Sequence, residues 1–289
     1  MEYHRREARI RRSRRPPRSP IRKADVSITA RYAAAQEIAA KAGRLAHRYF
    51  VERGSLSVES KGAQDFVSHA DRAVEALIRA EIARDFPEDT FLGEESAADF
   101  TGAEGRIWIV DPIDGTHNFL RGARYYCVSI AYVEDGRREI GVVSDPEHGE
   151  MFHARRGNGA WCTRAKGEER LSASDCASVA KAFICLGHHD RYPEPRYMVL
   201  RQKLMDSGAA MRNMGAGALQ LAHVAAGRYD AFIELSLNSW DAMAGLLLVE
   251  EAGGFAAPFP GPQGLRKPAP VLACASGIAE PLMRVVGEW

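Results

Sequence analysis

The sequence predicts a soluble protein of mixed α/β class, built as one large domain or as two closely packed halves. Three observations indicate this class. The chain has 289 residues, which is too long for one small core. Two early segments show helical spacing of apolar residues, and a later region has the pattern of an antiparallel strand meander. Hydrophobic residues make up 46% and charged residues 27%, so the composition indicates neither a disordered nor a fibrous chain.

Two amphipathic helices are expected near the start of the chain. In Val26 to Glu52, apolar residues recur every three or four positions, with arginine, lysine and glutamate between them. A second helix is expected over His69 to Asp85, because Ser68 and Asp71 fit a capping box and Pro87 follows the end. The capping box is by itself a sufficient structural explanation for Asp71, a residue that is considered again below for a functional role.

Short apolar runs predict buried strands in the middle of the chain. RIWIV at 106–110 has no polar helical face and delivers Asp111 at its C-terminal end. Within 126–162, the runs CVSIAYV and EIGVVSD lie on either side of an Asp135-Gly136 turn. This alternation predicts antiparallel strands joined as a meander.

The C-terminal half is expected to alternate helices with strands. Helical patterns cover Ala218 to Ala226 and Asp241 to Ala252, and the second ends at a pair of glycines. The runs YDAFIEL at 229–235 and APVLACAS at 269–276 predict strands before and after that second helix.

The first 25 residues are expected to form a flexible basic tail outside the folded domain. Residues 1–23 carry nine arginines and one lysine against two glutamates, and two adjacent prolines interrupt any continuous helix. The tail lacks the apolar segment of a secretory signal. Contact with nucleic acid phosphates and a wrongly chosen upstream start codon are both compatible with it. The folded domain is expected at 26–289, in approximate halves 26–160 and 161–289.

Cysteine spacing and hydropathy exclude other classes. The longest apolar runs are far shorter than the roughly 20 residues of a membrane-spanning helix, so no membrane partner is expected. The five cysteines are scattered, and none forms the CxxC pair typical of zinc or redox sites. We therefore expect a cytoplasmic protein with reduced thiols in its core.

The strongest functional signal is WIVDPIDGTHNF at 108–119. Asp111 and Asp114 follow a buried strand, and Pro112 is expected to break its ladder. Gly115 lets the backbone approach a ligand, with amide donors and the Thr116 hydroxyl nearby. Carboxylates beside backbone amides suit magnesium and phosphate. An ordinary turn would explain one DG pair, but it does not readily explain the whole DPIDGT string.

Two further acidic elements extend this signal. GEES places Glu94 and Glu95 at an expected strand end, and SWD places Asp241 at a helix start. Taken alone, Asp241 would be interpreted as a helix N-cap. Four of these acidic residues together supply enough carboxylates to bind two magnesium ions about 3.5–4 Å apart. They are Glu94, Asp111, Asp114 and Asp241.

As a set, DPIDGTHNF, GEES and WDAMAGLLLVEEAGG resemble the signatures of the inositol monophosphatase family of lithium-sensitive, magnesium-dependent phosphatases. The resemblance covers about Arg31 to Val286 and leaves out the basic tail. It implies a layered αβαβα sandwich of the inositol monophosphatase and fructose-1,6-bisphosphatase type, with 26–289 as the phosphatase domain. It also implies a homodimer and two or three Mg²⁺ ions per active site.

The resemblance implies roles for individual residues. The implied metal ligands are Glu94, Asp111, the Ile113 carbonyl, Asp114 and Asp241. The implied catalytic residues, which help to orient the attacking water, are Glu94, Thr116 and, at a second site, Asp71. The implied substrate-binding residues are Glu94, Ile113, Asp114, Gly115, Thr116, Gly215, Ala216, Gly217, Glu234 and Asp241. Ala216 stands where animal enzymes of the family often have threonine, which leaves the substrate open.

The expected reaction is hydrolysis of inositol monophosphate to inositol and phosphate by metal-activated water. No G-x-S-x-G elbow and no HExxH pattern occurs, which disfavours nucleophilic serine or zinc chemistry. Histidinol phosphate, fructose 1,6-bisphosphate and adenosine 3',5'-bisphosphate stay open as substrates. Glu234 could accept hydrogen bonds from inositol hydroxyls or from the ammonium group of histidinol phosphate. A non-enzymatic alternative is an RNA-associated regulator that uses the basic tail.

Overall fold

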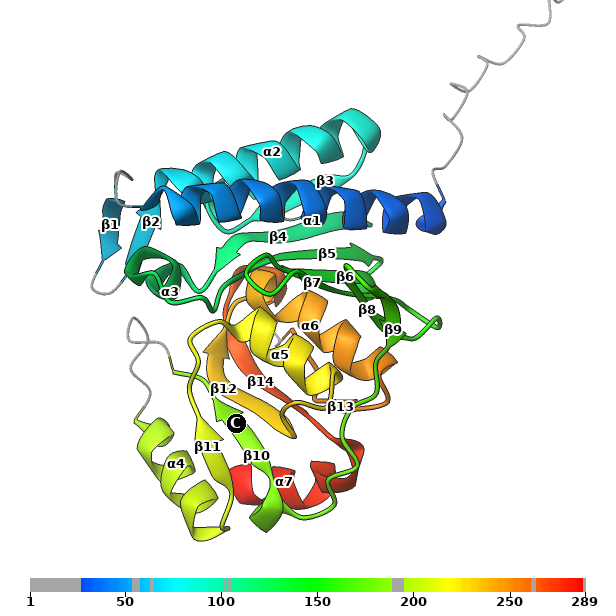
Figure 1. Ribbon diagram of the computed structural model, residues 1–289. Coiled ribbons are helices and arrows are strands. Elements are labelled where there is room, and N and C mark those ends of the chain that lie inside the picture. The colour runs from blue at the N-terminus through cyan, green and yellow to red at the C-terminus, as the bar shows by residue number, and fades with distance from the viewer. Residues whose placement is uncertain are drawn as a thin grey trace, which may run out of the picture.

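The chain folds into five stacked layers of alternating helices and sheets (Figure 1). The computed structural model describes residues 27–53, 58–62, 65–100, 102, 105–188, 195–260 and 264–287. The helices are α1 (Ile28–Val51), α2 (His69–Asp85), α3 (Thr116–Arg121), α4 (Arg196–Asp206), α5 (Gly217–Ala225), α6 (Ser239–Glu251) and α7 (Ala279–Val286). In order, the layers are α1 with α2, a first sheet, α5 with α6, a second sheet, and α4 with α7. The predicted αβαβα sandwich is therefore confirmed.

The first sheet has seven strands in the order of the sequence. They are β3 (Thr90–Gly93), β4 (Arg106–Asp114), β5 (Cys127–Glu134), β6 (Arg137–Asp145), β7 (Glu150–Arg155), β8 (Ala160–Arg164) and β9 (Gly167–Arg170). Only the first pair, β3 with β4, is parallel, and the expected meander from β5 to β8 is antiparallel throughout. A short hairpin of β1 (Val58–Gly62) and β2 (Asp65–Ser68) lies beside α3.

The second sheet has five strands and mixed pairing. Their order is β11 (Ala210–Arg212), β10 (Phe183–Leu186), β12 (Ala231–Leu237), β14 (Ala269–Cys274) and β13 (Phe255–Ala256). Strand β10 pairs in parallel with both β11 and β12, whereas β14 is antiparallel to its neighbours. The chain crosses from the first sheet to the second between Arg170 and Phe183. The approximate halves of the domain stay a prediction of the sequence.

Apolar side chains between the layers explain why the outer and inner helices differ in pattern. Helix α1 packs one face on the first sheet and exposes the other, which produces its amphipathic sequence. Helix α6 lies between both sheets, and its residues Ala242 to Val249 are all buried. On β6, a Cβ at Gly141 would lie 2.5 Å from the carbonyl oxygen of Ala244, so this glycine allows α6 to approach the sheet closely.

Two local expectations need correction. The ladder of β4 does not break at Pro112: the strand continues to Asp114, and its pairing with β5 shifts register between Asp111 and Asp114. The proline lacks an N–H donor, and this irregularity accommodates it within the strand. Helix α6 begins before Asp241, at Ser239 with Asn238 as its N-cap residue, so Asp241 lies in the first turn and is not the N-cap.

Other expectations fall partly outside the described residues. The basic tail at 1–25 and the side chain of Ser68 lie there. The described cysteines are free, and four of the five are buried, as expected of thiols that fill the core. Within the described ranges, no helix is long and apolar enough to cross a membrane.

Candidate active site

Three carboxylates converge where β4 ends beneath the first turn of α6. Oxygen atoms of Asp111, Asp114 and Asp241 all lie within 4.8 Å of one another. Glu94 follows β3, which is parallel to β4, so both strands deliver an acidic residue to the same edge of the sheet. The Glu94 N–H donates to the Val110 carbonyl at 3.0 Å. Glu94 is not within the 4.8 Å group, but its charge acts on Asp111.

The electrostatics of these carboxylates favour a bound cation. Asp111 is 2% exposed and Asp114 is 7% exposed. Burial, together with the charges of Glu94, Asp241 and Asp114, raises the pKa of Asp111 well above its ordinary value. Burial and the Asp241 charge raise the pKa of Asp114 to about 7, although backbone amides oppose this shift. A set of buried, mutually repelling oxygen ligands fits a hard divalent cation such as magnesium.

Asp114 is held by the N-terminus of helix α5. The backbone N–H groups of Gly217 and Ala218 donate to its two carboxylate oxygens, at 3.2 and 2.7 Å. The Cys127 thiol, on β5, lies 3.6 Å from the second oxygen. These amides would otherwise lack partners, and the positive end of the helix dipole faces a negative charge. The predicted Gly215 to Gly217 turn therefore meets the DPIDGT segment through Asp114.

The DGT loop places the Thr116 hydroxyl beside two of the predicted residues. Thr116 Oγ1 lies 3.1 Å from the Ile113 carbonyl oxygen and 3.5 Å from Asp71 Oδ1. Gly115 adopts φ 93°, and a Cβ there would lie 3.0 Å from the Tyr125 carbonyl oxygen and 3.1 Å from the Ala216 Cβ. Both the backbone conformation and the available space therefore require glycine at this position.

Asn118, which lies in the DPIDGTHNF string but received no role from the sequence, joins the two loops of the site. Its Nδ2 donates to the carbonyl oxygens of Tyr125 and Met214, both at 2.8 Å. Met214 immediately precedes Gly215, so one amide side chain ties the DGT loop to the turn before α5. Asn118 lies on the short helix α3, and its partner Met214 is 96 residues away along the chain, so the sequence carried no periodic signal for this contact.

Glu234 lies on β12, in the second sheet, and approaches the same carboxylates. It is 7% exposed, and burial with the charges of Asp241 and Asp114 raises its pKa well above its ordinary value. A Cβ at Gly187 would lie 2.0 Å from Glu234 Oε2, so the glycine after β10 leaves room for this carboxylate. The structure thus brings Glu234 close to the acidic group from the opposite sheet. Gly187 was not predicted.

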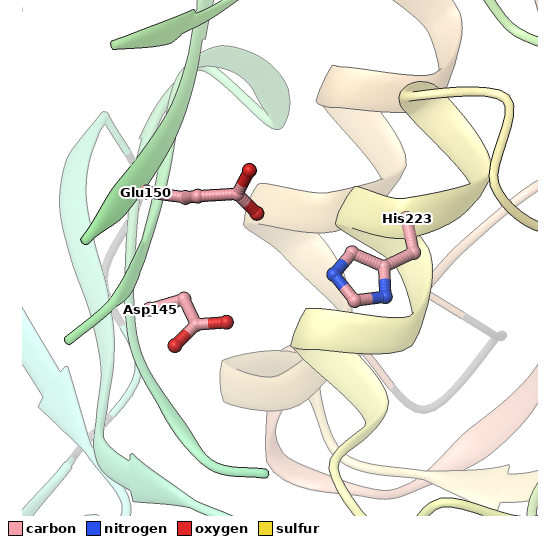
Figure 2. A group of neighbouring side chains, drawn as sticks. All are labelled: Asp145, Glu150 and His223. Atoms are coloured by element: carbon pink, nitrogen blue, oxygen red, sulfur yellow. The ribbon is translucent and has the colours of Figure 1, made fainter. Parts of the chain in front are cut away.

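A second cluster of potential ligands is better explained by ion pairs. Figure 2 shows Asp145 and Glu150, from β6 and β7, directed towards His223 on α5. Arg228 donates to Glu150 at 2.6 and 2.7 Å and lies 3.0 Å from His223 Nε2, and Arg164 also donates to Glu150. Although burial opposes it, these guanidinium groups lower the pKa of Glu150 to about 2. They already supply the positive charge that a metal ion would bring.

A five-layer α/β fold with buried carboxylates beside backbone amides is compatible with a phosphoric monoester hydrolase, and comparison with known proteins shows this class. The chain belongs to the inositol monophosphatase family, whose pattern matches residues 28–283. An inositol-1-monophosphatase of Rhizobium meliloti is 41% identical over 218 residues, which are 74% of this chain and 80% of the relative. The Nus factor SuhB of Pseudomonas aeruginosa is 40% identical over 229 residues, covering 77% and 83%.

Solved structures agree with this placement. A SuhB protein of Bartonella henselae matches with a TM-score of 0.79 and 34% identity, over 90% of this chain and 99% of that one. An inositol monophosphatase of Thermotoga maritima matches with a TM-score of 0.76 and 31% identity, over 89% and 96%. The predicted family and enzyme class are confirmed.

Proposed function

We propose that the protein hydrolyses inositol monophosphate to inositol and phosphate in a magnesium-dependent reaction. The observation that carries this proposal is the convergence of Asp111, Asp114 and Asp241 within 4.8 Å, in a family of phosphatases. Glu94 and the Ile113 carbonyl are the further proposed ligands. We assign two or three Mg²⁺ ions to this site, because its oxygen donors suit a hard cation.

The residues of the site have different roles in the proposed reaction. Bound magnesium supplies water activation and neutralises charge on the leaving oxygen. Glu94 and Thr116 orient the attacking water, and the Glu94 carboxylate accepts its proton. Asp71, 3.5 Å from Thr116 Oγ1, supports the same hydroxyl at the second site. Gly115 and the Gly215 to Gly217 turn contact the ester, and Glu234 receives hydroxyl groups of the alcohol.

The choice of inositol monophosphate rests on a relative's name and on Glu234. The Rhizobium meliloti relative is named for this activity. A buried carboxylate suits several hydroxyls, but it would also serve the ammonium group of histidinol phosphate. Fructose 1,6-bisphosphate and adenosine 3',5'-bisphosphate are further candidate substrates.

Phosphate release from these four esters, with and without magnesium chloride, tests the proposal. We expect the highest kcat/KM with inositol monophosphate and no activity after removal of divalent ions. A clear preference for another ester would change the substrate assignment, whereas full activity in chelator would overturn the metal mechanism. We also propose that lithium inhibits the enzyme at millimolar concentrations, which the same assay tests. We further propose that the protein is a cytoplasmic homodimer, and sedimentation measures its oligomeric state.

A second candidate function is a role with RNA or in transcription. Two observations favour it: the nine arginines in residues 1–23, and the name Nus factor carried by relatives such as that of Pseudomonas aeruginosa. The proposed contact is electrostatic, so its affinity should fall steeply with salt. Deletion of residues 1–25 should abolish salt-dependent RNA binding and leave phosphatase activity intact. Equal RNA binding by the full and shortened chains would exclude the tail as the contact.

A further inference from the structure

Glu75 is a buried carboxylate that the proposed mechanism does not use. It lies on α2, and its side chain is 6% exposed. Burying a carboxylate is costly unless it accepts hydrogen bonds. Glu75 Oε2 accepts the backbone N–H of Glu95 at 2.8 Å, and Oε1 lies 3.5 Å from an Arg79 guanidinium nitrogen. The first contact attaches α2 to the loop that carries Glu94.

Gly93, at the end of β3, makes room for this contact. A Cβ at Gly93 would lie 2.3 Å from Glu75 Oε2, a separation that non-bonded atoms do not reach. The backbone of Gly93 is not in the left-handed region, so space and not conformation requires the glycine. Glu75 and Gly93 therefore form a matched pair.

The peptide groups on both sides of Glu94 are fixed as a result. The Glu94 N–H donates to the Val110 carbonyl at 3.0 Å, just beyond the paired residues Gly93 and Val110. The next N–H, that of Glu95, donates to Glu75. With both peptides held, the direction in which the Glu94 side chain leaves the backbone is restricted. Its charge contributes to the raised pKa of Asp111.

The same face of α2 also contacts neighbouring parts of the site. Asp71, one turn before Glu75, lies 3.5 Å from Thr116 Oγ1. Arg79, one turn after it, donates to the Ser96 hydroxyl and lies over the Phe91 ring. Residues four apart share a helix face, so α2 aligns the two acidic loops with one row of polar side chains.

We propose that Glu75 is a positioning residue: through the Glu95 N–H it directs Glu94 into the acidic site, and Gly93 provides the space. The inference rests on the proposed role of Glu94 as a metal ligand. Glu75 acts on Glu94 through the backbone of the following residue, so it should affect metal binding more than recognition of the ester.

Magnesium titrations of Glu75 variants test the proposal. In Glu75→Ala the Glu95 N–H loses its acceptor, and the magnesium concentration for half-maximal activity should rise about 10-fold or more, as for lost outer-shell partners of metal ligands. The magnesium-induced rise in Tm, measured without substrate, should shrink in parallel. KM for the ester at saturating magnesium should stay near wild type. Glu75→Gln keeps an acceptor oxygen and should restore most of the magnesium affinity.

Glu81→Ala is the matched control on the same helix. The Glu81 carboxylate pairs with Lys41 and Arg84 at the surface, away from the site. Its loss should leave the magnesium requirement unchanged. Gly93→Ala should reproduce the Glu75→Ala defect without removing a charge. It should cost less when combined with Glu75→Ala, because the Phe91 ring, 2.7 Å from the new Cβ, is then the nearest group that remains in its way.

Glu94→Gln separates the positioning role of Glu75 from the proposed function. Suppose that Glu94→Gln raises the magnesium requirement, whereas Glu75→Ala and Gly93→Ala fold and keep the wild-type requirement. The positioning role of Glu75 is then wrong, and the proposed function is unaffected. If Glu94→Gln itself leaves the magnesium requirement unchanged, Glu94 is not a metal ligand, and the positioning role of Glu75 is also wrong. Should Glu75→Ala not fold, a wild-type magnesium requirement in Gly93→Ala overturns the proposal by itself.

Discussion

Asp114 is the residue at which burial, hydrogen bonding and charge act most directly against one another. Burial and the Asp241 charge raise its pKa to about 7, whereas the Gly217 and Ala218 amides stabilise its ionised form. A bound cation would stabilise the ionised form further and lower this pKa. The acidity of Asp114 therefore depends on whether metal is present.

Asp114→Asn should abolish most of the phosphatase activity while the protein stays folded. The amide keeps the shape of the side chain but removes one anionic ligand, and the core is not emptied. We expect kcat/KM to fall on the order of 100-fold or more, because metal ions supply several kcal/mol of transition-state stabilisation. Circular dichroism verifies folding. Turnover near that of the wild type at saturating magnesium would contradict the metal assignment.

Glu234→Gln should discriminate between substrates. Removing the charge should raise KM or lower kcat for the preferred ester, because a buried carboxylate no longer accepts its polar groups. An aryl phosphate has no hydroxyls to reach this side chain and should be hydrolysed nearly as before. Equal loss with both substrates would mean that Glu234 supports the structure of the site and does not recognise the alcohol.

Motif residues could be predicted from the sequence, and their supporting residues could not. Asp111, Asp114 and Asp241 stand in recognisable strings, which the resemblance made specific. Asn118 and Gly187 act through contacts with residues that are distant along the chain, at Met214 and Glu234. Such contacts depend on how sheets and loops pack, and a single sequence carries no periodic signal for them.

At the scale of elements, long periodic segments were predicted well and short ones were missed. Helix α2 has the bounds that its apolar stripe and cap predicted, His69–Asp85, and α1 differs from its expected range by only one or two residues at each end. Strands β9, β10 and β11 have three or four residues each, too few for a pattern to emerge. Their pairing is decided by the sheets to which they add.

Helix α5 should make the protein sensitive to acid through His223. Burial and Arg228 lower the pKa of His223 to about 4, so the folded protein keeps it neutral, whereas the unfolded chain protonates it near pH 6.5. Its contribution to stability is complete above pH 6.5 and is lost as the pH falls towards 4. Compared with His223→Gln, which cannot titrate, the wild type should lose up to about 3 kcal/mol across this range.

Urea unfolding of both proteins at several pH values between 7 and 4 measures this difference. Comparing variants cancels the other titrating groups, including the buried carboxylates of the active site, which act in the opposite direction. If the two stability curves run parallel, His223 takes up its proton alike in the folded and unfolded protein, and the interpretation of the Asp145, Glu150 and His223 cluster must change.

At the scale of the whole molecule, the candidate site exists only because several layers meet there. Strand β4 of the first sheet contributes two carboxylates, and the first turn of α6 and β12 of the second sheet contribute one each. The N-terminus of α5 adds amide donors from between the sheets. Unfolding separates these groups by more than a hundred residues of chain, so a cation that binds them should bind the folded state alone.

Magnesium should therefore raise the thermal stability of the protein. The charges of Glu94, Asp114 and Asp241 act on Asp111, and without a cation those that are ionised repel one another. A ligand specific for the folded state stabilises it by RT ln(1 + [L]/Kd), or roughly 2.7 kcal/mol at a hundred times Kd for one site. For a domain of this size, that free energy corresponds to a rise of several degrees in Tm.

The melting experiment needs constant ionic strength and a variant that lacks part of the site. Sodium chloride should replace the magnesium salt in the reference sample, so that general screening is not taken for site binding. Without metal, Asp114→Asn removes one repelling group from the buried cluster but turns an amide N–H towards one of the two backbone donors of α5, so its Tm should lie near that of the wild type. Its rise with magnesium should be much smaller. Equal rises in both proteins would mean that magnesium binds elsewhere, and the acidic group would have to be abandoned as the principal metal site.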